Sequence, residues 1–275
     1  MNEKENNLRI DVEGVIGSKN PRLLKVIPSF MINLVKKLIH QREINEILEN
    51  YGHLKGKAFA NAALNDLGIQ YKIHGLEKIG KNRRYMFVSN HPLGGLDGMI
   101  LIDVFGEMFD NVKFVVNDLL MHIEPLRSVF VPVNKYGRQN IDNAKMIIDA
   151  YDSDAQILYF PAGLCSRMVN GKITDLTWKK SFVNQAIKHG RDIVPIFFGG
   201  RNSTFFYKFA NIRKSLGIKF NYETILLPHE MFRQRNAIFD IFIGDPVPHE
   251  TLVEEGNPAY WSERLRSEVY NLNRL

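Results

Sequence analysis

The sequence contains a single cysteine, Cys165, among 275 residues. This scarcity excludes an intrachain disulfide framework and any metal cluster built from cysteine ligands, and it is typical of a reducing compartment. Long hydrophobic runs are also missing. No stretch of about eighteen or more uncharged apolar residues occurs, so we expect no membrane-spanning helix. Residues 1–7 are too polar for a secretory signal. We therefore expect a cytoplasmic protein.

Features of nucleic-acid-binding proteins are missing as well. The chain has no aromatic signature of an RNA-binding module, no zinc-finger spacing and no long basic tail, so we expect no nucleic-acid partner. It is nonetheless basic, with a formal net charge of +6 and a pI near 9.2. This charge favours an anionic partner, such as an acidic carrier protein, a phosphorylated substrate or an anionic membrane surface. Charge alone does not choose among them.

Short apolar segments alternate with amphipathic segments along most of the chain, which predicts an α/β fold. The expected strands are residues 70–74, 85–88, 112–116, 129–133, 156–161, 192–198, 223–227 and 237–243, and the main helices 54–67, 140–151, 178–189 and 258–272. This order predicts a mostly parallel or mixed central sheet flanked by helices.

We expect two parts within one compact unit. Residues 1–68 form an N-terminal helical subdomain, whose residues 1–18 are interpreted as a loosely ordered lead-in, and residues 69–275 form the α/β domain. The form of residues 203–220 is left open.

Residues 20–38 form a basic amphipathic segment. Apolar side chains recur at helical spacing up to Leu38, with lysines and arginines interspersed, and Pro28 is expected to split or kink the helix. Such a segment can lie in a bilayer interface with its apolar side among the acyl chains. It can equally pack its apolar stripe on the body of the protein. The sequence leaves both alternatives open.

The stretch 85–98, which reads Y-M-F-V-S-N-H-P-L-G-G-L-D-G, carries the strongest indication of chemistry. A buried strand is expected to end just before His91, and the Gly94-Gly95 pair lets the chain double back before Asp97. A carboxylate bonded to one imidazole nitrogen sets the tautomer and orientation that a general base needs. The plainer alternative is that Asp97 is the N-cap of the following helix while His91 is an ordinary turn residue.

Two other expected strands end in glycine-containing turns. Residues 156–161 lead into Gly163, and residues 192–198 lead into Gly200. Ligands of α/β sheets bind at the ends of the strands. We therefore expect these two turns to share one rim of the sheet with His91.

Four motifs in order give the sequence a resemblance to the phosphatidate-type (lysophospholipid) acyltransferases. Asn90, His91 and Asp97 correspond to the first motif, N-H-x4-D; residues 114–119 and 131–135 echo the second; residues 160–167, F-P-A-G-L-C-S-R, look like the third, F-P-E-G-T-R/S; and residues 193–196, I-V-P-I, match the fourth. The resemblance spans residues 70–200 and implies the fold of a glycerol-3-phosphate acyltransferase.

The chain departs from the family pattern at two places. Five residues separate His91 from Asp97 where the family has four, so the Gly94-Gly95 turn must absorb the extra residue. Ala162 stands where the family has a glutamate associated with a phosphorylated acceptor, which disfavours glycerol phosphate as the acceptor. The wording of the first and third motifs resembles the hemolysin-like branch, some of whose members O-acylate acyl-amino-acid lipids such as ornithine or glycine lipids.

The resemblance implies transfer of a fatty acyl group from acyl carrier protein or coenzyme A to the hydroxyl of a membrane lipid, with no cofactor and no metal. His91 is the expected general base, and Asp97 orients it. The expected substrate-binding residues are Asn90, Gly94, Gly95, Gly163, Ser166, Arg167 and Arg201. The two arginines are anion-binding candidates, although either could pair with an acid such as Asp175. We expect peripheral contact with the anionic inner face of the cytoplasmic membrane.

Other interpretations stay open at this point. The acceptor could be lysophosphatidic acid, or the protein could bind a lipid or a carrier without catalysis. Cys165 could act as a nucleophile that forms an acyl-enzyme. A metal site from His91, Asp97, Asp118 and His122 is conceivable but matches no known ligand spacing. The sequence does not indicate the donor, the acyl chain length or the oligomeric state.

Overall fold

The computed structural model describes residues 9–19, 21–133 and 141–273. The start of the expected lead-in, the last two residues of the second-motif echo at 131–135 and the first residue of the expected helix 140–151 lie outside the described residues.

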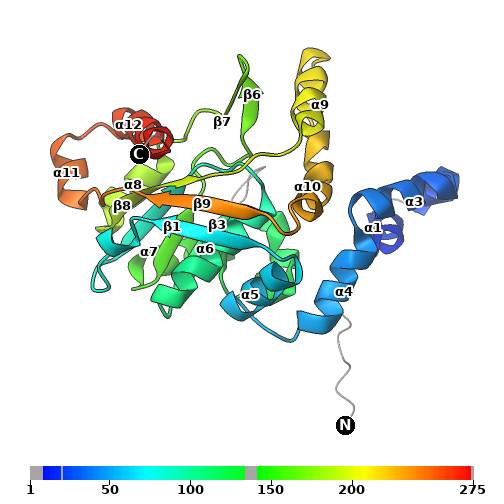
Figure 1. The fold of residues 1–275 in the computed structure, drawn as a ribbon, viewed down its shortest axis with the longest axis horizontal. Helices are drawn as coiled ribbons and strands as arrows, with labels where there is room; N and C mark the ends of the chain where they lie inside the picture. Colours follow the sequence, from blue (N-terminus) through cyan, green and yellow to red (C-terminus); the bar gives the residue numbers. More distant parts are fainter. Residues whose placement is uncertain (1–8, 20, 134–140, 274–275) are drawn as a thin grey trace, which may run out of the picture.

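A seven-stranded mixed sheet forms the centre of the molecule (Figure 1), as the sequence predicts. Its order is β1-β9-β8-β2-β5-β3-β4. The strands are β1 (Gln70–His74), β2 (Tyr85–Ser89), β3 (Val112–Asn117), β4 (Phe130–Val133), β5 (Gln156–Tyr159), β8 (Asp192–Phe198) and β9 (Ile238–Ile243). The strands β8, β2, β5, β3 and β4 run parallel, and β9 runs antiparallel to β8. The fold class is therefore confirmed as α/β.

Helices cover both faces of this sheet, and β2 shows why. Its side chains alternate between two hydrophobic clusters, with Phe87 in one and Met86 and Val88 in the other. Successive strand residues point to opposite faces, so a strand that is apolar throughout needs a helical layer on each side. The first layer contains α5 (Lys57–Asp66) and α6 (Gly95–Met108), and the second contains α7 (Ile141–Asp152), α8 (Ser181–His189) and α12 (Pro258–Leu272).

The topology brings the three expected strand ends to one edge. Both neighbours of the central strand β2, namely β5 and β8, run parallel to it. The turns that follow β2, β5 and β8 therefore leave the sheet on the same side. The predicted shared rim of His91, Gly163 and Gly200 is confirmed.

Several elements differ from the sequence expectations. Part of the lead-in is a helix, α1 (Val12–Lys19), and the open segment 203–220 contains α9 (Thr204–Ser215). The strand expected at 223–227 is wrong: Tyr222–Leu226 is a 3-10 turn, η4, and α10 (Leu227–Arg233) follows it with proline in its first turn. The connection after the third motif is a hairpin of β6 (Arg167–Val169) and β7 (Lys172–Thr174), and α11 (His249–Glu254) was not expected. Three further short turns are η1 (Leu76–Lys78), η2 (Asp118–His122) and η3 (Glu124–Leu126).

The N-terminal helices stand apart from the sheet. Figure 1 shows α1 and α3 (Ser29–Leu38) beyond α4 (Gln41–Tyr51) at one end of the molecule. Pro28 separates α2 (Pro21–Val26) from α3, as predicted. Some apolar side chains of α3 do not pack on the body, since Phe30 is 69% exposed and Leu34 is 62% exposed, whereas Ile32 is buried and Leu38 packs against a hydrophobic cluster. The division at residue 68 stays a prediction, because α5 already contributes to the main core. None of the described helices has the length and apolar character needed to cross a bilayer.

Candidate active site

His91 and Asp97 meet at the rim. The Nδ1 atom of His91 lies 3.1 Å from each carboxylate oxygen of Asp97, and the Asp97 side chain is fully buried. The extra residue in the motif therefore does not prevent the pairing. With Nδ1–H donating to the carboxylate, Nε2 is the ring atom left to accept a proton.

A glycine turn makes this pairing possible. Helix α6 begins at Gly95, and Gly94 precedes it with φ of 84°, a conformation that side chains disfavour. A Cβ on Gly94 would also lie 3.1 Å from Leu227. Asp97 is therefore in the first turn of α6 and is not its N-cap, which corrects that alternative. Its oxygens accept hydrogen bonds from the N–H groups of Leu93 and Gly98, each at 2.9 Å.

The imidazole of His91 is held on its other sides as well. Its ring stacks on Phe160, with the ring centroids 4.0 Å apart, and 16% of the side chain is exposed. Burial of the imidazole, the largest single effect, lowers the pKa of His91, but the charges and hydrogen bonds of Asp97 and Cys165 together raise it by more. The pKa of His91 consequently lies well above its ordinary value of 6.5.

Asp175 joins the first and third motifs. Its Oδ1 accepts hydrogen bonds from the backbone N–H of His91 at 3.2 Å and from the hydroxyl of Ser166 at 2.6 Å. Its Oδ2 accepts from Trp178 Nε1 at 2.9 Å, and the Ser166 N–H donates to the carbonyl of His91 at 2.7 Å. Burial raises the pKa of Asp175. Ser166 thus binds the loop that carries His91, a contact that the sequence did not predict.

Two asparagines attach the same loop to β8 and to the segment after it. Asn90 exchanges two hydrogen bonds with the backbone of Phe198, donating to its carbonyl at 3.0 Å and accepting from its N–H at 2.7 Å. Asn202 donates to the carbonyl of Pro92 at 3.0 Å. Both side chains are buried, so Asn90 acts here on the backbone and not on a ligand.

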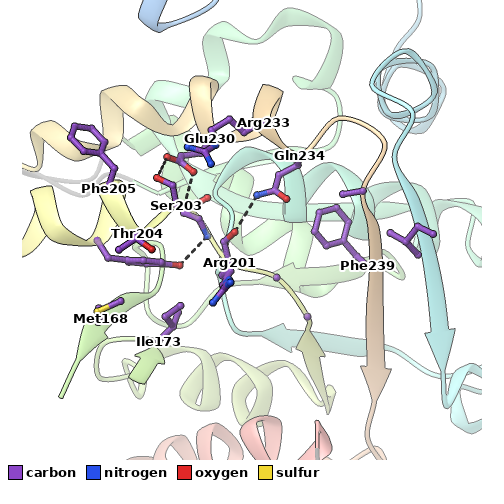
Figure 2. Close-up of a pocket in the computed structure, with 16 residues that line it drawn as sticks. Met168, Ile173, Arg201, Ser203, Thr204, Phe205, Glu230, Arg233, Gln234 and Phe239 are labelled. Carbon is purple, nitrogen blue, oxygen red and sulfur yellow. Dashed lines mark hydrogen bonds between the residues drawn. The ribbon is translucent and has the colours of Figure 1, made fainter. Parts of the chain in front are cut away.

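A cavity of about 670 Å³ lies beside this loop (Figure 2). It is lined by residues 199–205 after β8, by the start of β9, by the end of α10 and by two residues of the β6–β7 hairpin. Gly200 and Asn202 belong to its wall, and Asn202 also binds Pro92. His91 is not among the lining residues. The cavity therefore adjoins the His91 loop from the β8 side.

A model of the acyltransferase family matches residues 14–274 of the chain. The chain belongs to the acyltransferase family. This membership confirms the superfamily that the four motifs indicate, and it makes the protein an enzyme. The alternative of a non-catalytic binding protein is not retained.

Two curated acyltransferases are similar over almost the full chain. The lyso-glycine lipid O-acyltransferase of Bacteroides thetaiotaomicron is 45% identical over 264 residues, which cover 96% of this chain and 97% of that protein. The lyso-glycine lipid O-acyltransferase of Phocaeicola vulgatus is 42% identical over 264 residues, which cover 96% and 95%. A crystal structure of the 1-acyl-sn-glycerophosphate acyltransferase PlsC from Thermotoga maritima aligns with a TM-score of 0.47 and 15% identity, covering 89% of this chain and 97% of that one.

The glycines of the acyltransferase differ in what their N–H groups offer. Gly163, with φ of 63°, donates its N–H to the carbonyl of Phe160 at 3.0 Å. The N–H groups of Gly94 and Gly95 begin α6, where an α-helix leaves its first N–H groups without intrahelical partners. Such groups suit an oxyanion. Gly94 and Gly95 are therefore candidate oxyanion donors, whereas the N–H of Gly163 is already used in a hydrogen bond within its own turn.

The two candidate arginines have different surroundings. Arg167 is buried, and its guanidinium donates to Glu223 at 2.8 Å and to the carbonyl of Cys165 at 2.6 Å. The acid that it pairs with is thus Glu223 and not Asp175. Arg201 is exposed in the wall of the cavity, and none of the described acids forms an ion pair with its guanidinium. These contacts favour Arg201 over Arg167 as the arginine that meets a substrate anion.

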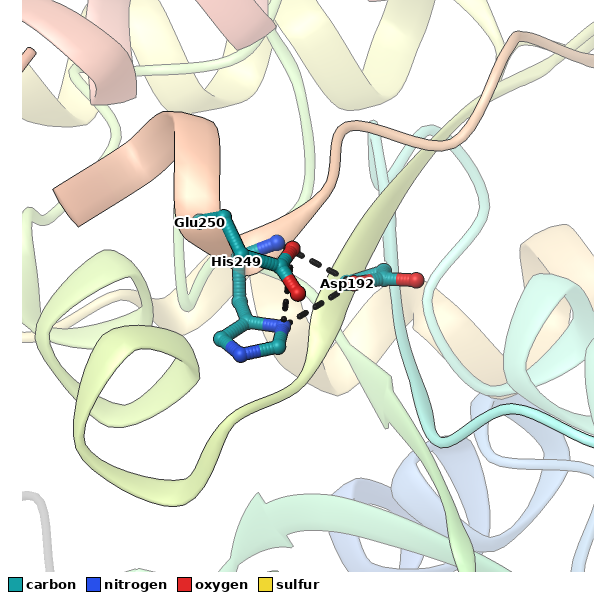
Figure 3. Close-up of side chains that lie close together, drawn as sticks. All are labelled: Asp192, His249 and Glu250. Atoms are coloured by element: carbon teal, nitrogen blue, oxygen red, sulfur yellow. Dashed lines mark hydrogen bonds and ion pairs between the residues drawn. The ribbon is translucent and has the colours of Figure 1, made fainter. Parts of the chain in front are cut away.

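One group of possible metal ligands occurs among the described residues. Asp192, His249 and Glu250 bring their ligand atoms within 4.8 Å of one another, away from the rim (Figure 3). Arg83 Nε, however, already lies 2.7 Å from Asp192 Oδ2. The Asp192 carboxylate also accepts from the His249 N–H at 3.0 Å, so this group holds α11 against β8.

Proposed function

We propose that this acyltransferase moves a fatty acyl group from an acyl thioester to the hydroxyl of an acyl-amino-acid lipid, with a lyso-glycine lipid as the preferred acceptor. The observation that carries the proposal is the buried Asp97 carboxylate 3.1 Å from Nδ1 of His91, whose side chain is 16% exposed. The identities of 45% and 42% to two lyso-glycine lipid O-acyltransferases support the acceptor.

The proposed reaction uses His91 as general base and then as general acid. Neutral Nε2 takes the proton of the acceptor hydroxyl while the oxygen attacks the thioester carbonyl. Asp97 stabilises the imidazolium that forms. The tetrahedral oxyanion is placed against the N–H groups of Gly94 and Gly95. Its collapse breaks the carbon–sulfur bond, His91 returns its proton to the thiolate, and the ester and free thiol leave.

The residue at position 162 also bears on the acceptor. Ala162 is apolar and buried at the position where the family has a glutamate. That glutamate is associated in the family with a phosphorylated acceptor, so its absence disfavours an acceptor that carries a phosphate. Lysophosphatidic acid is the alternative acceptor within the same chemistry.

The donor and the membrane contact belong to the same proposal. A net charge of +6 favours an acidic acyl carrier protein over a neutral partner.

Exposed apolar side chains of α3, such as Phe30 and Leu34, are proposed to enter the inner leaflet of the cytoplasmic membrane. Helix α9 continues this surface, since Phe205 and Leu216 are exposed and Leu38 of α3 packs against its apolar cluster.

An acceptor panel tests the proposal. Purified protein is given acyl carrier protein or coenzyme A thioesters with a hydroxylated N-acyl glycine, an ornithine analogue and lysophosphatidic acid, and the lipid products are identified. We expect the acyl-glycine ester to form fastest, with one free thiol released for each ester. Exclusive acylation of lysophosphatidic acid would favour the alternative acceptor.

Cys165 provides a second candidate mechanism, because its thiol neighbours His91 and helps to raise the pKa of the imidazole. In that mechanism the thiol would carry the acyl group before the acceptor attacks. Cys165 is buried, however, which leaves little room for a thioester donor. Replacement of Cys165 by serine separates the two mechanisms, since direct transfer through His91 needs no thiol.

A further inference from the structure

The cavity beside the His91 loop has two exposed arginines, Arg201 and Arg233, among polar and apolar lining residues. Arg201 forms part of the lining, and the side chains of Met168, Ile173 and Phe239 supply apolar surface around it (Figure 2). An unpaired guanidinium presents a planar fork of donors that matches a carboxylate. The chemistry of the lining therefore suits a small anionic group attached to an apolar tail.

The acidic residue among those that line the cavity, Glu230, already accepts hydrogen bonds from the protein itself. Glu230 is buried, and its carboxylate accepts hydrogen bonds from the N–H of Ser203 at 2.7 Å and from its hydroxyl at 2.5 Å. Arg201 is held through its backbone, where its carbonyl accepts from Gln234 Nε2 at 3.1 Å. The guanidinium of Arg201 thus remains available, and a second arginine, Arg233, lines the same cavity.

Asn202 connects the cavity to the catalytic loop. Its Nδ2 donates to the carbonyl of Pro92, the residue after His91. Its Oδ1 is buried and accepts no hydrogen bond from the described residues. Buried polar atoms normally have a partner, so this acceptor calls for a donor such as water or an amide N–H. Gly200 also contacts the loop, because a Cβ there would lie 3.1 Å from Leu93.

We propose that this cavity binds the headgroup of the acceptor, with its carboxylate on Arg201 and its amide N–H toward Asn202. The inference rests on the proposed acyl-amino-acid acceptor. Glycine has no hydroxyl, so the oxygen that is acylated must lie on the fatty acyl part, several bonds from the carboxylate. The carboxylate of such a molecule must therefore bind beside His91, so that the hydroxyl can reach the imidazole. The cavity lies beside His91 in this way, because its wall residues Asn202 and Gly200 adjoin Pro92 and Leu93, the two residues that follow His91.

Arg201→Leu tests the headgroup site against a matched control. The control is Arg127→Leu, which removes an exposed arginine that pairs with Glu124 outside the cavity. A hydrogen-bonded ion pair with a substrate is worth roughly tenfold or more in affinity. We expect Arg201→Leu to raise the KM for the N-acyl glycine acceptor about tenfold or more, with little change in kcat or in the KM of the thioester. Arg127→Leu should leave all three unchanged.

The acceptor itself provides the second arm. The methyl ester of the same N-acyl glycine lacks the carboxylate. For wild-type enzyme, the KM for the ester should therefore exceed the KM for the acid by about the factor by which Arg201→Leu raises the KM for the acid. Arg201→Leu should then treat acid and ester alike. An acid-to-ester preference that survives in Arg201→Leu would overturn the inference, and so would a rise in the thioester KM alone, which would assign the cavity to the donor.

Binding without turnover keeps the two proposals separate. Titration of N-acyl glycine into His91→Ala protein measures affinity in the absence of reaction, and Arg201→Leu in that background should weaken it about tenfold or more. If wild-type protein acylates the glycine lipid while Arg201→Leu binds it normally, the headgroup site is wrong and the proposed function stands. If no acyl-amino-acid lipid is acylated or bound at all, the proposed function fails first.

Discussion

The buried carboxylate of Asp175 accepts a hydrogen bond from the backbone N–H of His91 at 3.2 Å, across 84 positions of the chain. The same carboxylate accepts from Ser166 and Trp178. One acceptor is therefore shared by the His91 loop, the third-motif turn and the segment that leads into α8. The position of the His91 ring depends on this acid as well as on Asp97.

Asp175→Ala should lower both stability and kcat. It leaves the buried donors of Ser166 and Trp178 without a partner, at a cost of about 1–3 kcal/mol for each unsatisfied group. A shifted His91 loop should also lower kcat about tenfold or more. Urea unfolding and steady-state kinetics measure the two effects. Asp152→Ala is the control, since Asp152 bonds His189 at an exposed position; equal losses of kcat in both variants would rule out a special role for Asp175.

The activity of the enzyme should rise with pH. His91 must be neutral to accept a proton, and its pKa is raised, so at low pH the protonated form dominates and cannot act as the base. The pH profile of kcat/KM should therefore climb through a midpoint above 6.5. Asp97→Asn removes the charge that raises the pKa and leaves burial, which lowers it, so the midpoint of its residual activity should move to lower pH. A midpoint that stays in place would exclude His91 as the titrating group.

Arg167→Leu should destabilise the protein more than it weakens substrate binding. The arginine and Glu223 form a buried ion pair in which Glu223 keeps Arg213 as a second partner, so removal of Arg167 should cost roughly 3 kcal/mol, the low end of the range for breaking such pairs. The free energy of unfolding in urea should fall by about that amount, whereas the acceptor KM of the folded fraction should stay near wild type. Arg201→Leu is the opposite case, with unchanged stability. A stable Arg167→Leu protein with a raised acceptor KM would restore the original sequence prediction for this residue.

Membrane binding should depend on the apolar surface of α3. Phe30→Glu and Leu34→Glu each place a charge where burial of an apolar side chain contributes about 1.5–3 kcal/mol. Sedimentation with anionic vesicles should show binding weakened roughly tenfold or more for each. Val253→Glu on α11 is the control, because Val253 is also exposed and Figure 1 shows α11 at the opposite end of the molecule from α3. Equal binding by all variants would show that α3 is not the contact.

Much of the fold follows from local pattern, and the site follows only in part. The apolar runs that form β2 and β8 and the glycine turns beside them are local signals, so their shared rim could be predicted. The partners of Asp175, Asn202 and Arg167 could not, because each bond joins segments far apart in the chain and depends on the finished packing. No spacing in the sequence marks Asp175 as the acceptor for the His91 loop.

Contacts between distant segments also account for the wrong strand prediction at residues 223–227. Residues 223–227 look like a strand because Ile225, Leu226 and Leu227 are apolar in sequence. In the structure Glu223 is drawn inward by Arg167 and Arg213, and the chain turns through η4 into α10. A tertiary ion pair decides the local conformation there, and composition does not reveal it.

Acyl transfer by purified His91→Ala tests the central claim most directly, with Cys165→Ser measured beside it. Thiol release from an acyl thioester is followed with N-acyl glycine as the acceptor, and circular dichroism checks that both variants are folded. We expect the kcat of His91→Ala to fall by about 10²- to 10⁴-fold, as is usual when a general base is removed, while Cys165→Ser stays near wild type. Wild-type turnover by a folded His91→Ala protein would contradict the account.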